Sequence, residues 1–353
     1  MFLCQIIFIT FRTGENRVKS TKRLISAALV VVFSLSLSAC NMVAKTPEAI
    51  AKSTVAKVNG EKITRGELDG DPQLAQVTAQ LKSQYGDNYA SNSDAQATLK
   101  DQKGQLLDQL ITEKLLLQKA KELKLVPDDA TLTKETNSKY DEIKKAYGND
   151  TTAFTNSLKS AGFTEASLKA YLKNQIIISK VADNVTKNVK VDDAKIKEYY
   201  NGHQTEFTEQ PDTMDIAHIL VKTEDEAKKV KARLDKGEKF ADVAKEVSID
   251  TGSKASGGDL GTVNYVNSGL DPQFMAAAMA LKAGQISGPV QTQFGYHIIW
   301  VKTKNEYPVK PFDSVKETIK GNLLNNAKQS AFSAKIDEWK KAAKITKYDK
   351  NLI

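Results

Sequence analysis

The chain has 353 residues, of which 41% are hydrophobic and 27% charged, with only 8 prolines. This composition is typical of a globular protein with two or three domains, and it excludes a collagen-like chain or one that is disordered throughout. The net charge of +8 falls to +4 without the first 39 residues, which hold five basic residues and one acidic residue; lysine then alternates with Asp and Glu, so nucleic acid is not an expected partner.

Residues 19–40 have the parts of a signal peptide: a basic start, an apolar run at 24–37 and small residues before Cys40. The apolar run is shorter than the ~20 residues that a membrane span needs. Leu-Ser-Ala-Cys at its end resembles the lipobox of bacterial lipoproteins, which implies that 1–39 is removed and Cys40 carries lipid. The alternatives are a secretory peptide with an incidental cysteine and an uncleaved anchor.

Residues 1–17 precede this pattern, although a basic segment normally begins a signal peptide. We therefore expect translation to start at Val18 rather than Met1, which N-terminal sequencing of the precursor would decide. Cys4 and Cys40 are the only cysteines, so we expect no disulfide framework and no structural zinc site in the body of the protein. Residues 40–54 are small and polar, and predict a tether between lipid and folded domain.

The segment 55–200 predicts a hairpin followed by amphipathic helices. Alternating apolar residues flank Asn59-Gly60, a strong signal for a β-hairpin. Apolar residues then recur at helical spacing, which predicts helices around 106–123, 135–147, 167–185 and 192–200. Because a single amphipathic helix cannot bury its apolar stripe alone, this segment must pack on itself or on another part of the chain.

A linker is expected at 201–212, and beyond it the composition changes, since about half of the 19 glycines lie between 213 and 303. Four strands are expected in this module, at 215–222, 259–263, 288–291 and 296–301. Three helices are expected between them, at 224–234, 239–247 and 272–280. A helical pattern resumes in 305–346 and needs a partner. We expect it to pack on the N-terminal helices, which makes 213–304 an insert followed by a tail at 347–353.

Four short motifs follow one another in this module. They are Ala-His-Ile-Leu-Val at 217–221, Gly-Gly-Asp-Leu-Gly at 257–261, Ser-Gly-Pro-Val at 287–290 and Phe-Gly-Tyr-His-Ile-Ile at 294–299. In this order and at these separations they resemble the parvulin family of peptidyl-prolyl isomerases. With the lipobox and the start of the helical region, the chain resembles the PrsA-type foldase lipoproteins of Gram-positive bacteria.

The resemblance implies an α+β fold. A parvulin module, consisting of a four-stranded antiparallel sheet with surrounding helices, would be inserted in a mainly α-helical chaperone domain formed by the N- and C-terminal segments. Within the module, His218 and His297 would be adjacent on the central strands, with Thr292 hydrogen-bonded nearby. Asp250 would face the substrate carbonyl as a carboxylate that acts electrostatically.

The resemblance also implies an apolar pocket for the prolyl ring, formed by Leu260, Leu270 and Phe274. Each of these assignments has a structural alternative, since a histidine on a strand can be a satisfied core residue and Asp250 can be a turn former. A metal site of two histidines and an aspartate lacks any short His-x-His spacing. Rotation about an X-Pro bond requires no metal or cofactor, and none is expected.

We therefore expect an extracytoplasmic foldase that is held at the cell membrane by lipid on Cys40. It would bind unfolded exported proteins in its helical domain and isomerise their X-Pro bonds in the module. One alternative is a chaperone whose module is catalytically silent. Another is a solute-binding lipoprotein, with a small-molecule pocket between two α/β lobes. Client identity and dimerisation through the helical domain stay open.

Overall fold

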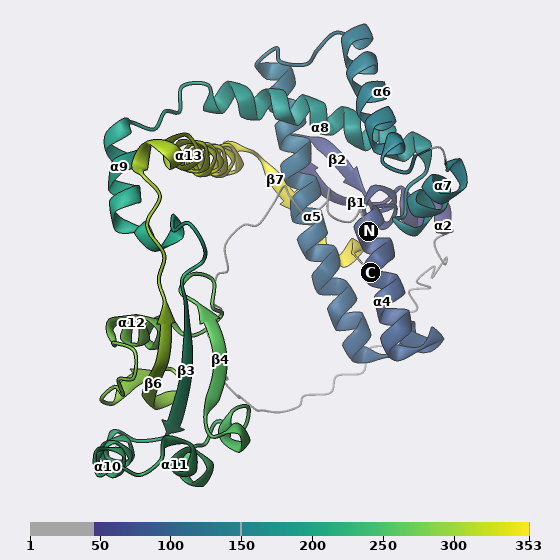
Figure 1. Ribbon diagram of the computed structural model, residues 1–353. Coiled ribbons are helices and arrows are strands. Elements are labelled where there is room, and N and C mark those ends of the chain that lie inside the picture. The colour runs from purple at the N-terminus through teal and green to yellow at the C-terminus, as the bar shows by residue number, and fades with distance from the viewer. Residues whose placement is uncertain (1–45, 149, 353) are drawn as a thin grey trace, which may run out of the picture. The chain divides into compact units, whose positions relative to one another are not determined.

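The computed structural model describes residues 46–148 and 150–352 (Figure 1). The expected signal peptide, Cys40 and the first part of the expected tether lie outside the described residues. The described residues divide into two compact units: a terminal unit, formed by those up to 188 and from 329 onward, and an inserted unit, residues 189–328. Within the described ranges, no helix has the length and apolar character that crossing a bilayer requires.

The terminal unit contains a small sheet that joins the two ends of the chain. β1 (Thr54–Val58) pairs antiparallel with β2 (Glu61–Thr64), and Asn59 and Gly60 between them have φ angles of 50° and 90°. The predicted hairpin is confirmed, because positive φ at both central residues is what a tight two-residue turn requires. β7 (Ile345–Lys347) pairs with the other edge of β1 (Figure 1), giving the order β2-β1-β7.

Helices make up the rest of the terminal unit. They are α2 (Pro47–Ala51), α3 (Arg65–Asp69), α4 (Pro72–Tyr85), α5 (Ser93–Glu122), α6 (Asp129–Lys145), α7 (Thr151–Ser160), α8 (Glu165–Thr186) and the last part of α13 (Phe312–Ala342). α5, α6 and α8 start earlier than expected, because the side chains of Asn92, Asp128 and Thr164 accept hydrogen bonds from their first-turn N–H groups. Such caps begin a helix before its apolar stripe does.

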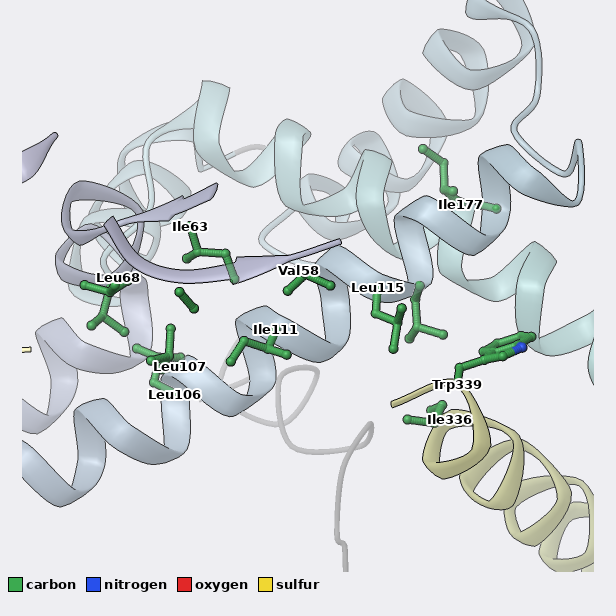
Figure 2. Packing of buried hydrophobic residues seen from close by; sticks show 14 of the residues in the cluster. Val58, Ile63, Leu68, Leu106, Leu107, Ile111, Leu115, Ile177, Ile336 and Trp339 are labelled. Atoms are coloured by element: carbon green, nitrogen blue, oxygen red, sulfur yellow. The ribbon is translucent and has the colours of Figure 1, made fainter. Parts of the chain in front are cut away.

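The core of the terminal unit combines residues from far apart in the sequence (Figure 2). Leu115 of α5 and Ile336 and Trp339 of α13 belong to one cluster of buried side chains, which also includes Val58 of the hairpin. The end of α13 therefore buries its apolar face against the N-terminal helices.

Both ends of the described chain differ from expectation. Part of the expected tether forms α2, which Thr46 caps. The expected tail is packed: Leu352 is only 5% exposed and joins the core, while Arg65 Nη1 donates to the Asn351 carbonyl at 2.7 Å. The sequence gives no local signal for this packing, because so short a segment has no visible periodicity of its own.

The inserted unit is built on a four-stranded antiparallel sheet in the order β4-β3-β6-β5. Its strands are β3 (Thr213–Val221), β4 (Asp259–Asn264), β5 (Val290–Thr292) and β6 (Gly295–Asn305), with β3 between β4 and β6 (Figure 1). Its helices are α9 (Asp193–Gly202), α10 (Glu224–Asp235), α11 (Phe240–Val247), α12 (Pro272–Ala280) and the first part of α13. The expected α+β fold with this sheet is confirmed.

The two faces of β3 have different partners, as its two-residue period requires. Ala217, Ile219 and Val221 pack with buried residues of α10 and α11. Ile216 belongs instead to a cluster with Phe274 of α12. His218 follows two residues after Ile216, so it lies on the face of α12.

The inserted unit is wider than the expected module. Ile196 of α9 packs with Val315 and Ile319 of α13, so both flanking helices contribute to it. The expected linker is also packed, since Asp212 is 6% exposed and accepts the Tyr307 N–H at 2.8 Å. The amphipathic pattern shows that α9 and α13 bury a face, but it does not show which partner covers it.

Candidate active site

Two histidines that are 79 positions apart in the sequence meet on one face of the sheet. His218 lies on β3 and His297 on β6, whose pairing register sets His297 opposite Leu220. His218 is therefore its diagonal neighbour on the same face. The two Nδ1 atoms are 3.0 Å apart, and the rings stack with centroids at 5.2 Å. Both residues are at most 6% exposed.

Hydrogen bonds extend from this pair in both directions. His218 Nε2 is 3.0 Å from Asp250 Oδ2, in the loop after α11, and His297 Nε2 is 2.8 Å from Thr292 Oγ1 at the end of β5. The Phe294 N–H in turn donates to Thr292 Oγ1 at 3.1 Å. The structure thus brings His218, His297, Asp250 and Thr292 together, as the resemblance implied.

The direction of this chain of hydrogen bonds follows from its acceptor end. A carboxylate only accepts, so His218 Nε2 carries hydrogen and donates to Asp250. For two neutral rings, His218 Nδ1 must then accept from His297 Nδ1–H. His297 Nε2 is left as an acceptor, and the Thr292 hydroxyl donates to it. Every polar atom of the chain has a partner, which a buried network requires.

The charge states of Asp250 and His297 support this direction. Burial tends to raise the pKa of Asp250, but hydrogen bonds from Ser253, His218 and the Gly252 N–H outweigh it and bring the pKa to about 2. Burial, together with the neighbouring His218, lowers the pKa of His297 to about 4. At neutral pH, Asp250 is therefore a carboxylate and His297 a neutral imidazole.

One member of the cluster was missed by the sequence analysis. Ser253 Oγ donates to Asp250 Oδ2 and lies 3.1 Å from His218 Nε2. The Ser253 N–H also donates to Asp250 Oδ2 at 3.0 Å. Asp250 therefore organises a turn and contacts His218 at the same time. An Asp followed three residues later by Ser is the pattern that could have drawn attention to the hydroxyl.

Gly258, in the 257–261 motif, lies directly against the backbone of His218. The Gly258 carbonyl accepts the His218 N–H at 2.8 Å, and Gly258 has φ +82°. A Cβ atom at this position would be 2.2 Å from the His218 carbonyl oxygen. Only glycine allows the loop backbone to approach the strand this closely.

The three expected pocket residues share one cluster but differ in exposure. Phe274 is 3% exposed and meets both imidazoles edge-on, with ring centroids 5.6 Å from His218 and 5.2 Å from His297. Leu260 and Leu270 are partly buried against the same cluster. In residues 46–148 and 150–352, no group of three or more His, Cys, Asp or Glu side chains could hold a metal ion.

The low pKa of His297 predicts an acid-sensitive inserted unit. The unfolded chain binds this proton near the ordinary pKa of 6.5, and the folded chain only near 4. The neutral His297 imidazole therefore contributes fully to the free energy of unfolding above pH 6.5. This contribution is lost as the pH falls towards 4, and the total loss is about 3 kcal/mol. Asp250 contributes to the pH dependence of stability only below its ordinary pKa of 3.8.

The measurement is urea unfolding from pH 7 to pH 4, followed by fluorescence. Trp300 lies in the inserted unit and Trp339, the other tryptophan, in the terminal unit, so a Trp339→Phe background reports the inserted unit alone. His297→Asn should remove most of the loss in stability. An unchanged pH dependence in His297→Asn would contradict the assignment.

Comparisons with known proteins agree with this geometry. Residues 191–317 match the PPIC-type PPIASE domain family, and residues 11–182 match the SurA-like N-terminal domain. The foldase protein PrsA of Clostridium botulinum (strain 657 / Type Ba4) is 57% identical over 335 residues, covering 95% of this chain and 100% of the relative. The foldase protein PrsA of Clostridium kluyveri is 55% identical over 340 residues, with the same coverage.

A crystal structure of peptidylprolyl isomerase PrsA from Bacillus anthracis is 31% identical, with a TM-score of 0.37. The match covers 66% of the present chain and 96% of the Bacillus anthracis chain. The full-length identity to the clostridial relatives decides the family. The chain therefore belongs to the PrsA foldase family, and its inserted unit is a peptidyl-prolyl cis-trans isomerase domain of the parvulin type.

Proposed function

We propose that this foldase isomerises X-Pro bonds of exported client proteins at the cluster of His218, His297, Asp250 and Thr292. The observation that carries the proposal is the hydrogen-bond chain through all four side chains, which holds each in one orientation. Dipoles that are fixed in advance need no reorganisation when the charge distribution of the substrate changes, and this is a major source of catalysis.

The reaction is a rotation in which no covalent bond forms or breaks. Amide resonance gives the C–N bond its double-bond character and a barrier of about 18–20 kcal/mol. Acceleration from tens of seconds to milliseconds takes roughly four decades, or about 5 to 6 kcal/mol. The site must therefore bind the twisted amide more tightly than the planar one by this amount.

Asp250 supplies part of this preference through its charge. Resonance in the planar amide places negative charge on the carbonyl oxygen, and twisting returns that charge to the nitrogen. A carboxylate beside the carbonyl therefore raises the free energy of the planar amide more than that of the twisted amide. With a pKa of about 2, Asp250 keeps this charge at neutral pH.

Apolar contacts with the prolyl ring supply the rest of the binding. We assign the exposed parts of Leu260 and Leu270 to the prolyl ring, with the buried Phe274 beneath them against both imidazoles. Burying the ring removes apolar surface from water and also removes water from the amide. The twisted amide is less polar than the planar one, so it loses less hydration in this process.

The test is whether the chain from residue 41 onward accelerates the cis-trans exchange of an X-Pro peptide, measured by exchange NMR. We expect acceleration at catalytic concentrations of the protein. An unchanged exchange rate would leave the alternative of a chaperone with a catalytically silent module. The solute-binding alternative is not retained, since the family assignment rests on nearly the whole chain.

The terminal unit offers a place for apolar side chains of an unfolded client. A cavity of about 560 Å³ lies between the ends of α5 and α8 and the last turns of α13, with Leu123, Val185, Ala331 and Trp339 among its lining residues. Leu123 is 40% exposed. We propose that client side chains bury apolar surface here while the isomerase unit acts on their X-Pro bonds.

Replacing Leu123 with Glu is expected to weaken the suppression of client aggregation severalfold without changing isomerase kcat/KM. The reason is that a carboxylate in an apolar contact must be desolvated. Light scattering from an unfolding client measures the effect. Ile50→Glu is the matched control, since Ile50 is 41% exposed in the same unit and does not line the cavity. An equal loss in both variants would contradict the role of the cavity.

We also propose that lipid on Cys40 holds the protein at the extracytoplasmic face of the cell membrane. This rests on the basic, apolar and small-residue order of 19–40. Cys40→Ser is expected to move the protein from the membrane fraction to the medium and to abolish incorporation of labelled fatty acid. Retention of Cys40→Ser in the membrane fraction would contradict the proposal.

A further inference from the structure

Ser253 is a buried polar residue beside Asp250, with only 2% of its surface exposed. It sits directly before the short helical turn η3 (Lys254–Ser256). Its hydroxyl donates to Asp250 Oδ2 and is 3.1 Å from His218 Nε2, while its backbone N–H donates to the same Oδ2 at 3.0 Å. One residue thus touches both the carboxylate and the imidazole at the acceptor end of the hydrogen-bond chain.

The two oxygens of Asp250 are therefore not equivalent. Oδ2 accepts from the Ser253 hydroxyl, from the Ser253 N–H and from His218 Nε2. Oδ1 has only a long contact of 3.4 Å with the Gly252 N–H. The Asp250 side chain is 28% exposed, so Oδ1 is the oxygen that is left for a substrate.

We infer that Ser253 is a positioning residue for the isomerase reaction, which orients Asp250 through Oδ2 and keeps hydrogen on His218 Nε2. This inference rests on the proposed function of the His218–His297 cluster. A hydroxyl suits the position because it can accept from His218 Nε2–H and donate to the carboxylate at once. With so little exposure, bulk water does not reach the hydroxyl to replace it.

Ser253→Ala removes one of the three hydrogen bonds to Oδ2 and frees the carboxylate to rotate. In the full chain from residue 41, we expect kcat for an X-Pro peptide to fall about tenfold, with KM within twofold of its original value, because a misplaced charge weakens transition-state binding most. We also expect the imidazole ¹⁵N spectrum of His218 to change from one tautomer with hydrogen on Nε2 to a mixture.

Ser256→Ala is the matched control. Ser256 lies in the same turn, and its hydroxyl donates to the Ser253 carbonyl at 2.9 Å rather than to Asp250. It should keep both kcat and the His218 tautomer. If Ser253→Ala does not fold, Ser253→Cys provides the same comparison with a weak donor of similar size.

Equal kcat values for the Ser253 and Ser256 variants would overturn the inference. A loss of kcat with an unchanged His218 spectrum would overturn it as well, because the effect would then be structural. These outcomes are separate from failure of the proposed function, which would appear as an absence of isomerase activity in the parent chain. The ¹⁵N spectrum would still report on Ser253 in that case.

Discussion

Replacing both His218 and His297 with alanine is expected to lower kcat/KM for X-Pro isomerisation by about 100-fold or more. The two rings form the middle of the hydrogen-bond chain, so their loss removes the imidazole partner of both Asp250 and Thr292 and breaks the connection between them. Removal of one preorganised polar group from an active site commonly costs this much. Exchange NMR on a proline-containing peptide, with the chain from residue 41 onward, measures the effect.

The third histidine of the chain provides the control for this experiment. His203 is exposed and lies in the same unit, where its ring contacts the Tyr199 carbonyl and stacks on the Tyr199 ring, so His203→Ala should keep the original kcat/KM. Trp300 fluorescence in urea shows whether the inserted unit of the double variant is folded. A folded double variant with undiminished kcat/KM would mean that the imidazoles are structural and that catalysis lies elsewhere.

Replacing Gly258 with alanine is expected to destabilise the inserted unit by about 4 kcal/mol or more and to abolish activity. The new Cβ atom would lie 2.2 Å from the His218 carbonyl oxygen, so either the loop or the strand that carries His218 must move. The new Cβ is fixed to the loop backbone and its neighbour is a backbone oxygen, so no flexible side chain can rotate away to relieve the contact. The unfolding free energy from urea titration of Trp300 fluorescence measures the loss.

Gly284→Ala separates this clash from simple backbone strain. Gly284 has φ +83°, within one degree of Gly258, but a Cβ there would meet nothing within 4 Å. Its cost should be only the roughly 1–2 kcal/mol of a left-handed alanine. If both variants lost the same stability, close approach to His218 would not be the reason that glycine occupies position 258.

Many elements of secondary structure could be predicted because their signals are local. Asn59-Gly60 specifies its own turn, and α12 has the bounds that the sequence predicts, since Pro272 begins it directly after the capping side chain of Asp271. The strands of the inserted unit lie within a few residues of expectation. Such signals involve neighbours along the chain, so no knowledge of the tertiary structure is needed to read them.

Contacts between segments that are far apart in the sequence could not be predicted from local patterns. The motifs around His218 and His297 marked both residues through their resemblance to a family, not through any pattern that places two rings together. The inserted unit extends beyond the expected module on both sides, because α13 packs with Ile196 near its start and with the terminal core near its end. An amphipathic stripe has the same appearance whichever partner covers it.

The sequence alone determined the hairpin, most helices and strands, and the parvulin motifs that contain His218 and His297. Tertiary structure alone decided that two Nδ1 atoms meet at 3.0 Å, that Asp250 presents one oxygen to Ser253 and His218, and that the last residues close the core. These contacts depend on strand register and on packing across long sequence separations, which are set by the free energy of the whole fold rather than by neighbouring residues.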